Sequence, residues 1–271
     1  MKEVLSLKLI VRGADYGMTT SITDGCLRAI REGILTDVGL MTNNHSAISA
    51  AEEIKKHPQI SVGQDLNLVS GIPVTDPSLI QSLVNEEGRF YTSSERKNLN
   101  KLDISYDEII LEMDNQVKRF IELMGRKPSY LVGHSFSTPE IDEGIKAIRE
   151  KYQVLENCFA DSELYVGERW YFKNLKIKPN ENKPRYDLEA QMNTNVEQFI
   201  LEDCCQLLGH DYALLATHCG YCDGELLEMS SFSVIRGKEL EALCSPKVKE
   251  WINKNKIELI NYDQYIELRR E

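Results

Sequence analysis

The sequence predicts an α/β fold, specifically an irregular (β/α) barrel of the TIM-barrel-like kind. Apolar runs of strand type alternate with amphipathic helical segments from one end of the chain to the other. Strands separated by helices indicate a parallel sheet with crossover helices. The chain has 271 residues, and such a barrel takes about 250 residues as one unit, so we expect a single domain over 1–271. A doubly wound open sheet is the alternative, since strand closure cannot be read from a sequence.

The first elements follow from periodicity and from helix-end signals. Residues 7–11 form a short β-type run that ends at the segment Arg12-Gly13-Ala14-Asp15-Tyr16-Gly17. The next segment has an apolar stripe at helical spacing and a glycine, Gly33, at its expected end. We predict a strand at 38–41 and a helix over 46–56, which stops before Pro58 because the residue preceding proline disfavours the helical region.

The middle of the chain contains the clearest alternation. Over 59–69, Ile60, Val62, Leu66 and Leu68 share one face of a strand, whereas Gly63, Asp65 and Asn67 share the other. A long helix is predicted at 107–124 and a strand at 130–134. Thr138-Pro139-Glu140 then predicts the start of a helix, with threonine at the cap, proline at the first position and an acid in the first turn.

The last third continues the alternation. Helices are expected at 196–208 and 247–255, and strands at 213–217 and 257–260. The stretches 70–104 and 160–195 lack clear periodicity and are predicted to be long loops over one end of the barrel. The charged segment 267–271 is predicted to be a solvated tail.

Composition argues against several partners. The net charge of −11 disfavours binding to phosphate backbones and docking on anionic membranes. No segment approaches the ~20 apolar residues of a membrane span, and the first residues lack the apolar run of a signal peptide. Together with seven scattered cysteines, which are read as reduced thiols, this predicts a cytoplasmic protein. A homo-oligomer remains open.

Chemistry-bearing residues follow the predicted strands, where the reactive groups of parallel α/β folds gather. These residues are Asp15, Asp65 with Asn67, His134, and His218 with Asp223. Taken alone, Asp15 is more simply a turn aspartate or a helix cap. Asp65 must point into the barrel, and a carboxylate there needs a cation or several donors. The ordinary alternative for it is a salt bridge to an inward lysine or arginine.

Two carboxylates and one imidazole from three strand ends form a candidate site for a divalent ion. A lone histidine such as His134 is more often a packed or surface residue. His218 can donate a proton near neutral pH, or it can make a structural hydrogen bond to a neighbouring loop. The pair Cys219-x-x-Cys222 has no second such pair, so we give redox or zinc chemistry there little weight.

At these motifs the chain resembles the YdjC-like carbohydrate deacetylases, which include chitooligosaccharide and hopanoid-pathway deacetylases. The segment 12–17 resembles the family's Ala-Asp-Asp-Phe-Gly. Residues 63–68 with 70–73 resemble its Gly-Leu-His-Leu-Asn-Leu and the following Gly-x-Pro, and 88–90 its Gly-x-Phe. Gly133-His134 resembles its histidine-rich motif and 217–221 its late His-Pro-Gly. The likeness runs from about residue 7 to residue 265, with the motifs in order.

The resemblance implies a (β/α) barrel, one divalent metal ion and hydrolysis of an N-acetyl group on an amino sugar or oligosaccharide. The family's metal ligands fall on Asp15, Asp65 and His134, with carboxylate in place of histidine at Asp65. This donor set favours magnesium, manganese or zinc. His218 would protonate the leaving amine or stabilise the oxyanion. Asn67, Tyr16 and Asp223 are the candidates for substrate binding or support of the site.

One departure weakens the predicted catalysis. The family's presumed general base falls on Ala14, which cannot accept a proton, and loss of a positioned base typically costs about 10²–10⁴-fold in rate. The first hypothesis is therefore a metal-dependent amidohydrolase. The second is a sugar-binding pseudoenzyme that retains the metal site, with an engineered base mutation as a further explanation of Ala14. The third is a metal hydrolase acting on a non-sugar amide.

Overall fold

The computed structural model describes residues 6–98, 104–154, 159, 161–167, 169, 171–175, 177–178 and 185–270. The strands are β1 Lys8–Tyr16, β2 Asp37–Leu40, β3 Ser61–Leu66, β4 Leu131–Gly133, β5 Tyr165–Val166, β6 Ile177–Lys178, β7 Arg185–Tyr186, β8 Tyr212–Thr217 and β9 Glu258–Leu259. The helices are α1 Thr20–Glu32, α2 Ala47–Ile54, α3 Ser93–Asn98, α4 Tyr106–Met124, α5 Pro139–Tyr152, α6 Tyr171–Asn174, α7 Leu188–Asn193, α8 Val196–Leu201, α9 Gly224–Met229, α10 Val234–Cys244, α11 Pro246–Lys254 and α12 Tyr262–Arg270, with a 3-10 turn at Pro77–Leu79.

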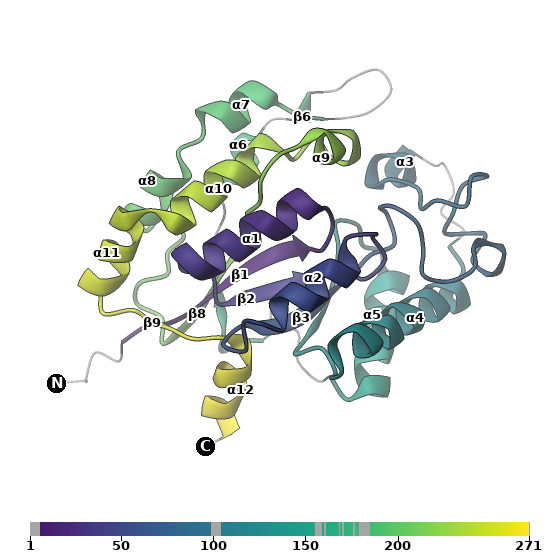
Figure 1. Ribbon diagram of the computed structural model, residues 1–271, viewed down its shortest axis with the longest axis horizontal. Helices are drawn as coiled ribbons and strands as arrows, with labels where there is room; N and C mark the ends of the chain where they lie inside the picture. Colours follow the sequence, from purple (N-terminus) through teal and green to yellow (C-terminus); the bar gives the residue numbers. More distant parts are fainter. Residues whose placement is uncertain are drawn as a thin grey trace.

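A curled parallel sheet forms the centre of the molecule, with helices around it (Figure 1). The strand order is β4-β3-β2-β1-β8-β5, and β9 adds to β1. Every pairing described in this sheet is parallel, which places the carboxyl ends of the strands along one edge. The predicted α/β barrel class is thus confirmed, in the form of a half-barrel between the edge strands β4 and β5.

Strand β1 occupies the middle of this sheet because its side chains can be buried on both faces. Leu9 and Val11 pack with the helices in the largest apolar cluster, while Ile10 belongs to a separate cluster on the other face. Arg12 has the same parity as Ile10, and only 3% of it is exposed. A charged side chain is therefore directed into the concave side of the sheet, where burial is tolerated only with a partner.

Several predicted helix ends are confirmed. Thr138 caps α5, as predicted, by accepting a hydrogen bond from a backbone N–H group in the first turn. Thr19, which the sequence patterns do not predict, caps α1 in the same way. Gly125 ends α4 in the left-handed conformation, with φ of 70°. Helix α1 also approaches the loop after β8 so closely that a Cβ on Gly25 would lie 2.6 Å from the Gly220 backbone.

Three expectations need correction. The helix predicted at 196–208 ends at Leu201, because the chain then turns through Asp203 and Gln206 at positive φ. Residues 267–270 are exposed, as predicted for a solvated tail, but they form the end of helix α12, which is anchored by the fully buried Tyr262 and Tyr265, and residue 271 lies outside the described residues. The two predicted loops, as far as they are described, contain short helices and strands.

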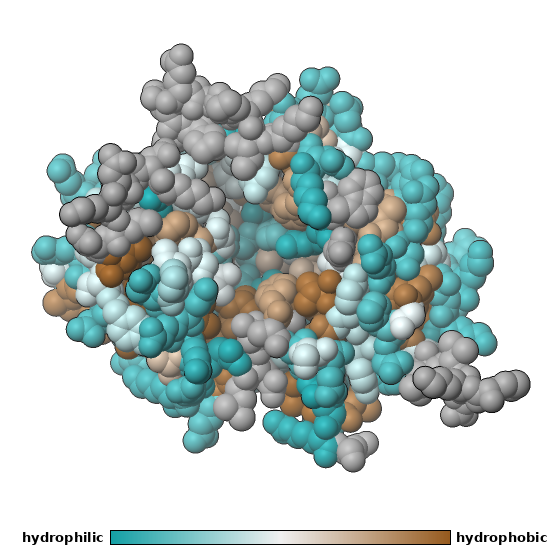
Figure 2. All heavy atoms as spheres, turned by 180° about the vertical axis from the view of Figure 1, so that it is seen from behind, coloured by the Kyte–Doolittle hydropathy of each residue, from teal (hydrophilic) through white to brown (hydrophobic). Residues whose placement is uncertain are grey.

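Seen from the side opposite to Figure 1, the molecule is hollowed near its centre, with hydrophilic atoms deep in the hollow and hydrophobic side chains beside it (Figure 2). Over the described residues, no helix combines the length and the apolar character needed to cross a membrane.

Candidate functional site

A bulge at the end of β1 turns Asp15 toward the neighbouring strands. The register between β1 and β2 shifts between Gly13 and Tyr16, and Asp15 has a φ of 64°. Aspartate tolerates this left-handed conformation better than most residues, and bulges commonly re-aim a side chain next to a functional site. As a result the Asp15 backbone N–H donates to Asp65 Oδ2 at 2.9 Å, and the Asp15 side chain is 1% exposed.

Asp65 on β3 forms a buried ion pair with Arg12 on β1. Arg12 Nη2 contacts Asp65 Oδ1, and each side chain is 3% exposed. The sequence-based expectation that Asp65 points into the barrel is therefore confirmed. The partner of Asp65 is an inward arginine, as in the salt-bridge alternative to a metal ion. The Arg12 side chain reaches Asp65 across the intervening strand β2.

The strands on either side make room for the guanidinium and hold it in place. Gly39 on β2 lies under the pair, since a Cβ there would meet the Asp65 carboxylate and lie 2.5 Å from Arg12 Nη2. Arg12 Nε donates to Tyr130 Oη at 2.8 Å, and Tyr130 in turn donates to Asp37 Oδ1 at 2.5 Å. The lack of a side chain at Gly63 leaves the space that the Tyr130 ring fills.

His134 and Arg236 reach Asp15 from two different elements. His134, which follows β4, places Nδ1 2.8 Å from Asp15 Oδ1, and its backbone N–H donates to Leu66 O. Arg236 on α10 places Nη2 2.8 Å from Asp15 Oδ2. Arg236 is itself fixed because its Nε donates to the Phe232 carbonyl at 2.9 Å. Asp15 Oδ2 thus accepts a hydrogen bond from Arg236, whereas Oδ1 has His134 Nδ1 at ion-pair distance but no hydrogen-bond donor in suitable geometry among the described residues.

His218 follows β8 and lies beside this cluster. Its backbone N–H donates to Glu239 Oε2 at 2.6 Å, and Glu239 also accepts a hydrogen bond from the Tyr171 hydroxyl. Its Nδ1 is 3.1 Å from Arg169 Nη1. A guanidinium can only donate, so Nδ1 accepts and a neutral His218 carries its proton on Nε2.

The pKa shifts follow from burial and from these neighbours. For Asp15, burial opposes ionisation, but His134 and Arg236 outweigh it and hold the pKa well below its usual range. Burial would lower the pKa of His134, yet the Asp15 carboxylate raises it above the ordinary value. For Asp65, burial raises the pKa although Arg12 opposes the shift. Burial lowers the pKa of His218 well below its ordinary value, so this imidazole is neutral at neutral pH.

The remaining predicted residues have well-defined positions. Ala14 lies buried in the β1 bulge. Tyr16 is fully buried and donates its hydroxyl to the Ala50 carbonyl, away from the Asp15 side chain. Asn67 fastens its own loop, since its amide contacts Asn43 and the Ser70 carbonyl. Asp223 caps helix α9. These contacts give Tyr16, Asn67 and Asp223 structural roles, and substrate binding by them stays a prediction.

The donor set does not fit the predicted divalent ion. Asp65 directs one oxygen to Arg12 and the other to a backbone N–H. Asp15 directs Oδ2 to Arg236, and its Oδ1, which accepts no hydrogen bond from the described residues, has His134 Nδ1 at 2.8 Å. Within the part of the chain that the structure describes, no cluster of three or more histidine, cysteine, aspartate or glutamate side chains is arranged to hold a metal ion.

Sequence reasoning missed Arg12, Arg236, Arg169 and Glu239 as site residues. For Arg12 a signal was present, because it shares the strand face of Ile10 and precedes Asp15 in the same motif. The other side chains come from α10 and from a segment before α6. No local pattern in the sequence marks them as neighbours of Asp15 or His218.

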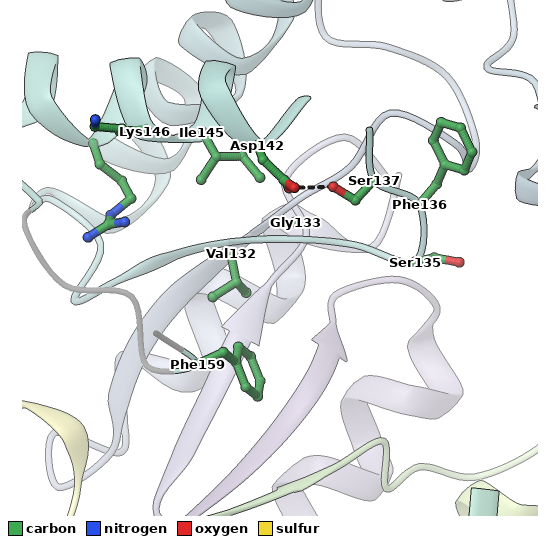
Figure 3. Close-up of a pocket in the computed structure, with 10 residues that line it drawn as sticks. Val132, Gly133, Ser135, Phe136, Ser137, Asp142, Ile145, Lys146 and Phe159 are labelled. Atoms are coloured by element: carbon green, nitrogen blue, oxygen red, sulfur yellow. Dashed lines mark hydrogen bonds between the residues drawn. The ribbon is translucent and has the colours of Figure 1, made fainter. Parts of the chain in front are cut away.

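A pocket of about 530 Å³ adjoins the site between β4 and α5 (Figure 3). Gly133 and Ser135, the chain neighbours of His134, line it together with Phe159 and Lys146. The Phe159 ring lies 5.4 Å from the Arg12 guanidinium carbon, measured to the ring centroid. The pocket therefore lies close to both His134 and the Arg12–Asp65 pair.

Comparison with known proteins gives a consistent set of relatives. The YdjC-like protein family matches residues 8–254. "Carbohydrate deacetylase 2" of Listeria innocua is 33% identical over 264 residues, which cover 94% of this chain and 98% of the relative. "Carbohydrate deacetylase" of Clostridium beijerinckii is 27% identical over 262 residues, with 94% and 99% covered.

One solved structure shows the same fold. It is a crystal structure from Enterococcus faecalis V583, described as that of a proposed cellobiose-phosphate cleavage protein. It superposes with a TM-score of 0.76 at 22% sequence identity, and the match covers 96% of this chain and 99% of the other.

Proposed function

Since the chain belongs to the YdjC-like protein family, we propose that it hydrolyses the N-acetyl group of an amino sugar or of a short oligosaccharide. Its relatives are named carbohydrate deacetylases. The observation that carries the proposal is the Asp15–His134 pair at the carboxyl ends of β1 and β4, where Nδ1 and Oδ1 are 2.8 Å apart. Reactive groups gather at this edge in parallel α/β folds.

The Asp15–His134 pair supports a role in activating water. Because Nδ1 of the imidazole faces the carboxylate, Nε2 is the nitrogen that remains to accept a proton from water. An aspartate in this position holds the ring in one orientation and stabilises the charge that develops on it. Arg236, on the other Asp15 oxygen, keeps that carboxylate in place. No step of this scheme passes through a metal ion.

His218 supports the proposal at the carbonyl oxygen of the acetyl group. A neutral imidazole with its proton on Nε2 can donate a hydrogen bond to the oxygen that becomes negative when water attacks the acetyl carbonyl. The lowered pKa of His218 makes the neutral donor its working form, so of its two predicted roles we favour oxyanion stabilisation over protonation of the amine. The leaving amine then receives, as its C–N bond breaks, the proton that His134 Nε2 took from water.

The pocket beside β4 suits a sugar in size and chemistry. Its volume of about 530 Å³ falls within the usual range for small-molecule sites. Phe159 offers an apolar face, while Ser135, Ser137 and Lys146 offer polar groups. Ser137 is held by Asp142, so part of the polar lining is fixed before any sugar binds.

Acetate release tests the proposal. The purified protein is incubated with N-acetylated chito-oligosaccharides, and acetate is measured over time. We expect slow release that His134→Gln abolishes and that His45→Gln, a change at a mostly exposed histidine, leaves unaltered. Absence of acetate with both the wild type and Ala14→Asp would contradict the proposed hydrolysis.

Ala14 favours a second candidate, a carbohydrate-binding protein without turnover. The resemblance places the family's base at this position, and the methyl group of Ala14 lies buried in the bulge next to Asp15. Calorimetry would separate the two functions: saturable binding of the acetylated sugar by a protein that releases no acetate supports the binding role. Turnover in Ala14→Asp would then identify the missing base as the cause.

A further inference from the structure

We infer that the Arg12 guanidinium takes the place of the metal ion that the family resemblance implies, so that this chain binds no divalent ion at Asp15, Asp65 and His134. The inference deepens the proposed function, on which it rests for the identity of the site. It is carried by the contacts of the side chains themselves.

The two buried carboxylates of the site each have one guanidinium, Arg12 for Asp65 and Arg236 for Asp15. An ion between the two carboxylates would have to share them with both guanidiniums in a buried region, where like charges repel strongly. The cations that neutralise this site are already part of the chain.

A metal ligand directs a lone pair at the ion, with bonds of about 2.0–2.2 Å for nitrogen and carboxylate oxygen. Here Asp15 Oδ1 and His134 Nδ1 are 2.8 Å apart, which leaves no room for an ion bonded to both atoms on the line between them. Asp65 Oδ2 is engaged by the Asp15 N–H at 2.9 Å. Both oxygens of Asp65 are therefore engaged by groups of the chain, Oδ1 by Arg12 and Oδ2 by the Asp15 N–H.

The surroundings of the Arg12 guanidinium accommodate it specifically. Gly39 leaves the space through which the Arg12 side chain reaches Asp65. Tyr130 accepts from Arg12 Nε at 2.8 Å and its ring lies 5.2 Å from the guanidinium carbon. Asp37 holds the Tyr130 hydroxyl from the other side. Groups from β2, β3 and the residue before β4 thus fix the cation that β1 supplies.

Metal uptake tests the inference without need for turnover. Wild type, Arg12→Ala, Asp65→Asn and the surface control Arg28→Ala are dialysed against zinc or manganese, and bound metal is then measured by elemental analysis. We expect no stoichiometric ion in the wild type or in the control. Arg12→Ala, which frees the Asp65 carboxylate, should take up one ion per chain and gain a few degrees in melting temperature from it.

The opposite result is equally clear. One ion per wild-type chain, lost in Asp65→Asn, would overturn the inference. If Arg12→Ala fails to fold, the comparison of the wild type with Asp65→Asn decides alone, because absence of the ion from both supports the inference. Acetate release is followed in parallel. Its absence would remove the proposed hydrolysis, while metal uptake would still decide the role of Arg12.

Discussion

Arg12 and Asp65 form a buried ion pair between β1 and β3 that crosses the intervening strand β2 at Gly39. The pair lies beside Asp15, whose backbone N–H donates to the same Asp65 carboxylate. Strand β2 is therefore part of the site although it contributes no charged group to the pair.

The first prediction concerns that glycine. Gly39→Ala would force a Cβ into the space of the ion pair, and such overpacking typically costs about 1–3 kcal/mol. Gly237→Ala is the matched control, because a Cβ at Gly237 meets nothing within 4 Å and its helical position should gain about 0.5–1 kcal/mol. Urea unfolding of both variants measures the difference. Equal stability of Gly39→Ala and Gly237→Ala would contradict the close contact between Gly39 and the Arg12–Asp65 pair.

The second prediction concerns the pair itself. Arg12→Met leaves Asp65 as an uncompensated buried charge, and we expect a loss of about 3–5 kcal/mol in unfolding free energy. Arg12→Met combined with Asp65→Leu should recover most of that loss, because neither charge then remains. The control Arg28→Met, whose ion pairs are with exposed glutamates, should change stability far less. A double variant no more stable than Arg12→Met would argue against a direct pair.

The third prediction concerns pH. Burial raises the pKa of Asp37 to about 8, compared with about 3.9 in an unfolded chain. The folded state therefore holds the Asp37 proton more tightly than the unfolded state does. The resulting stabilisation is fully present below about pH 4 and is lost as the pH rises toward the folded pKa, by about 1.4 kcal/mol per pH unit.

Asp37→Asn removes this titration. Between about pH 5 and pH 7, the wild type should lose up to about 3 kcal/mol relative to the variant. Chemical denaturation at several pH values gives this difference directly. A stability difference that stays constant over the range would show that Asp37 does not titrate with a raised pKa.

The fourth prediction concerns His218. If the protein releases acetate, His218→Gln should lower kcat by about 10²–10³-fold, the usual effect of removing one oxyanion donor. KM should change little, since this hydrogen bond strengthens mainly in the transition state. His210→Gln, at an exposed histidine stacked on Tyr165, should keep the wild-type kcat. A KM effect without a kcat effect would assign His218 to ground-state binding instead.

Local patterns predicted most of the fold. Alternation along β3 correctly placed Asp65 on the inward face, and cap residues such as Thr138 fixed helix starts. Helix α12 was missed because its charged segment reads as solvated, whereas Tyr262 and Tyr265 bury one side of it against the barrel. Such burial depends on tertiary contacts that no local window contains.

The candidate site was predicted only in part. The sequence predicts that Asp15 and His134 lie close together, and Asp15 Oδ1 is 2.8 Å from His134 Nδ1. The partner of Asp65 was foreseen only as one alternative, an unspecified inward cation. Arg12 fits that role because it faces inward on β1, but its reach across Gly39 depends on the order of the strands, which periodicity does not give. Arg236, which contacts Asp15, lies on a helix more than 200 residues after it in the sequence.

A crystal structure of the wild-type protein soaked with zinc or manganese, with anomalous scattering data, tests the replacement of the ion by Arg12 most directly. The account predicts that the Arg12–Asp65 pair stays in place and that no anomalous peak appears among Asp15, Asp65 and His134. A full-occupancy peak there, with Arg12 turned away from Asp65, would contradict it.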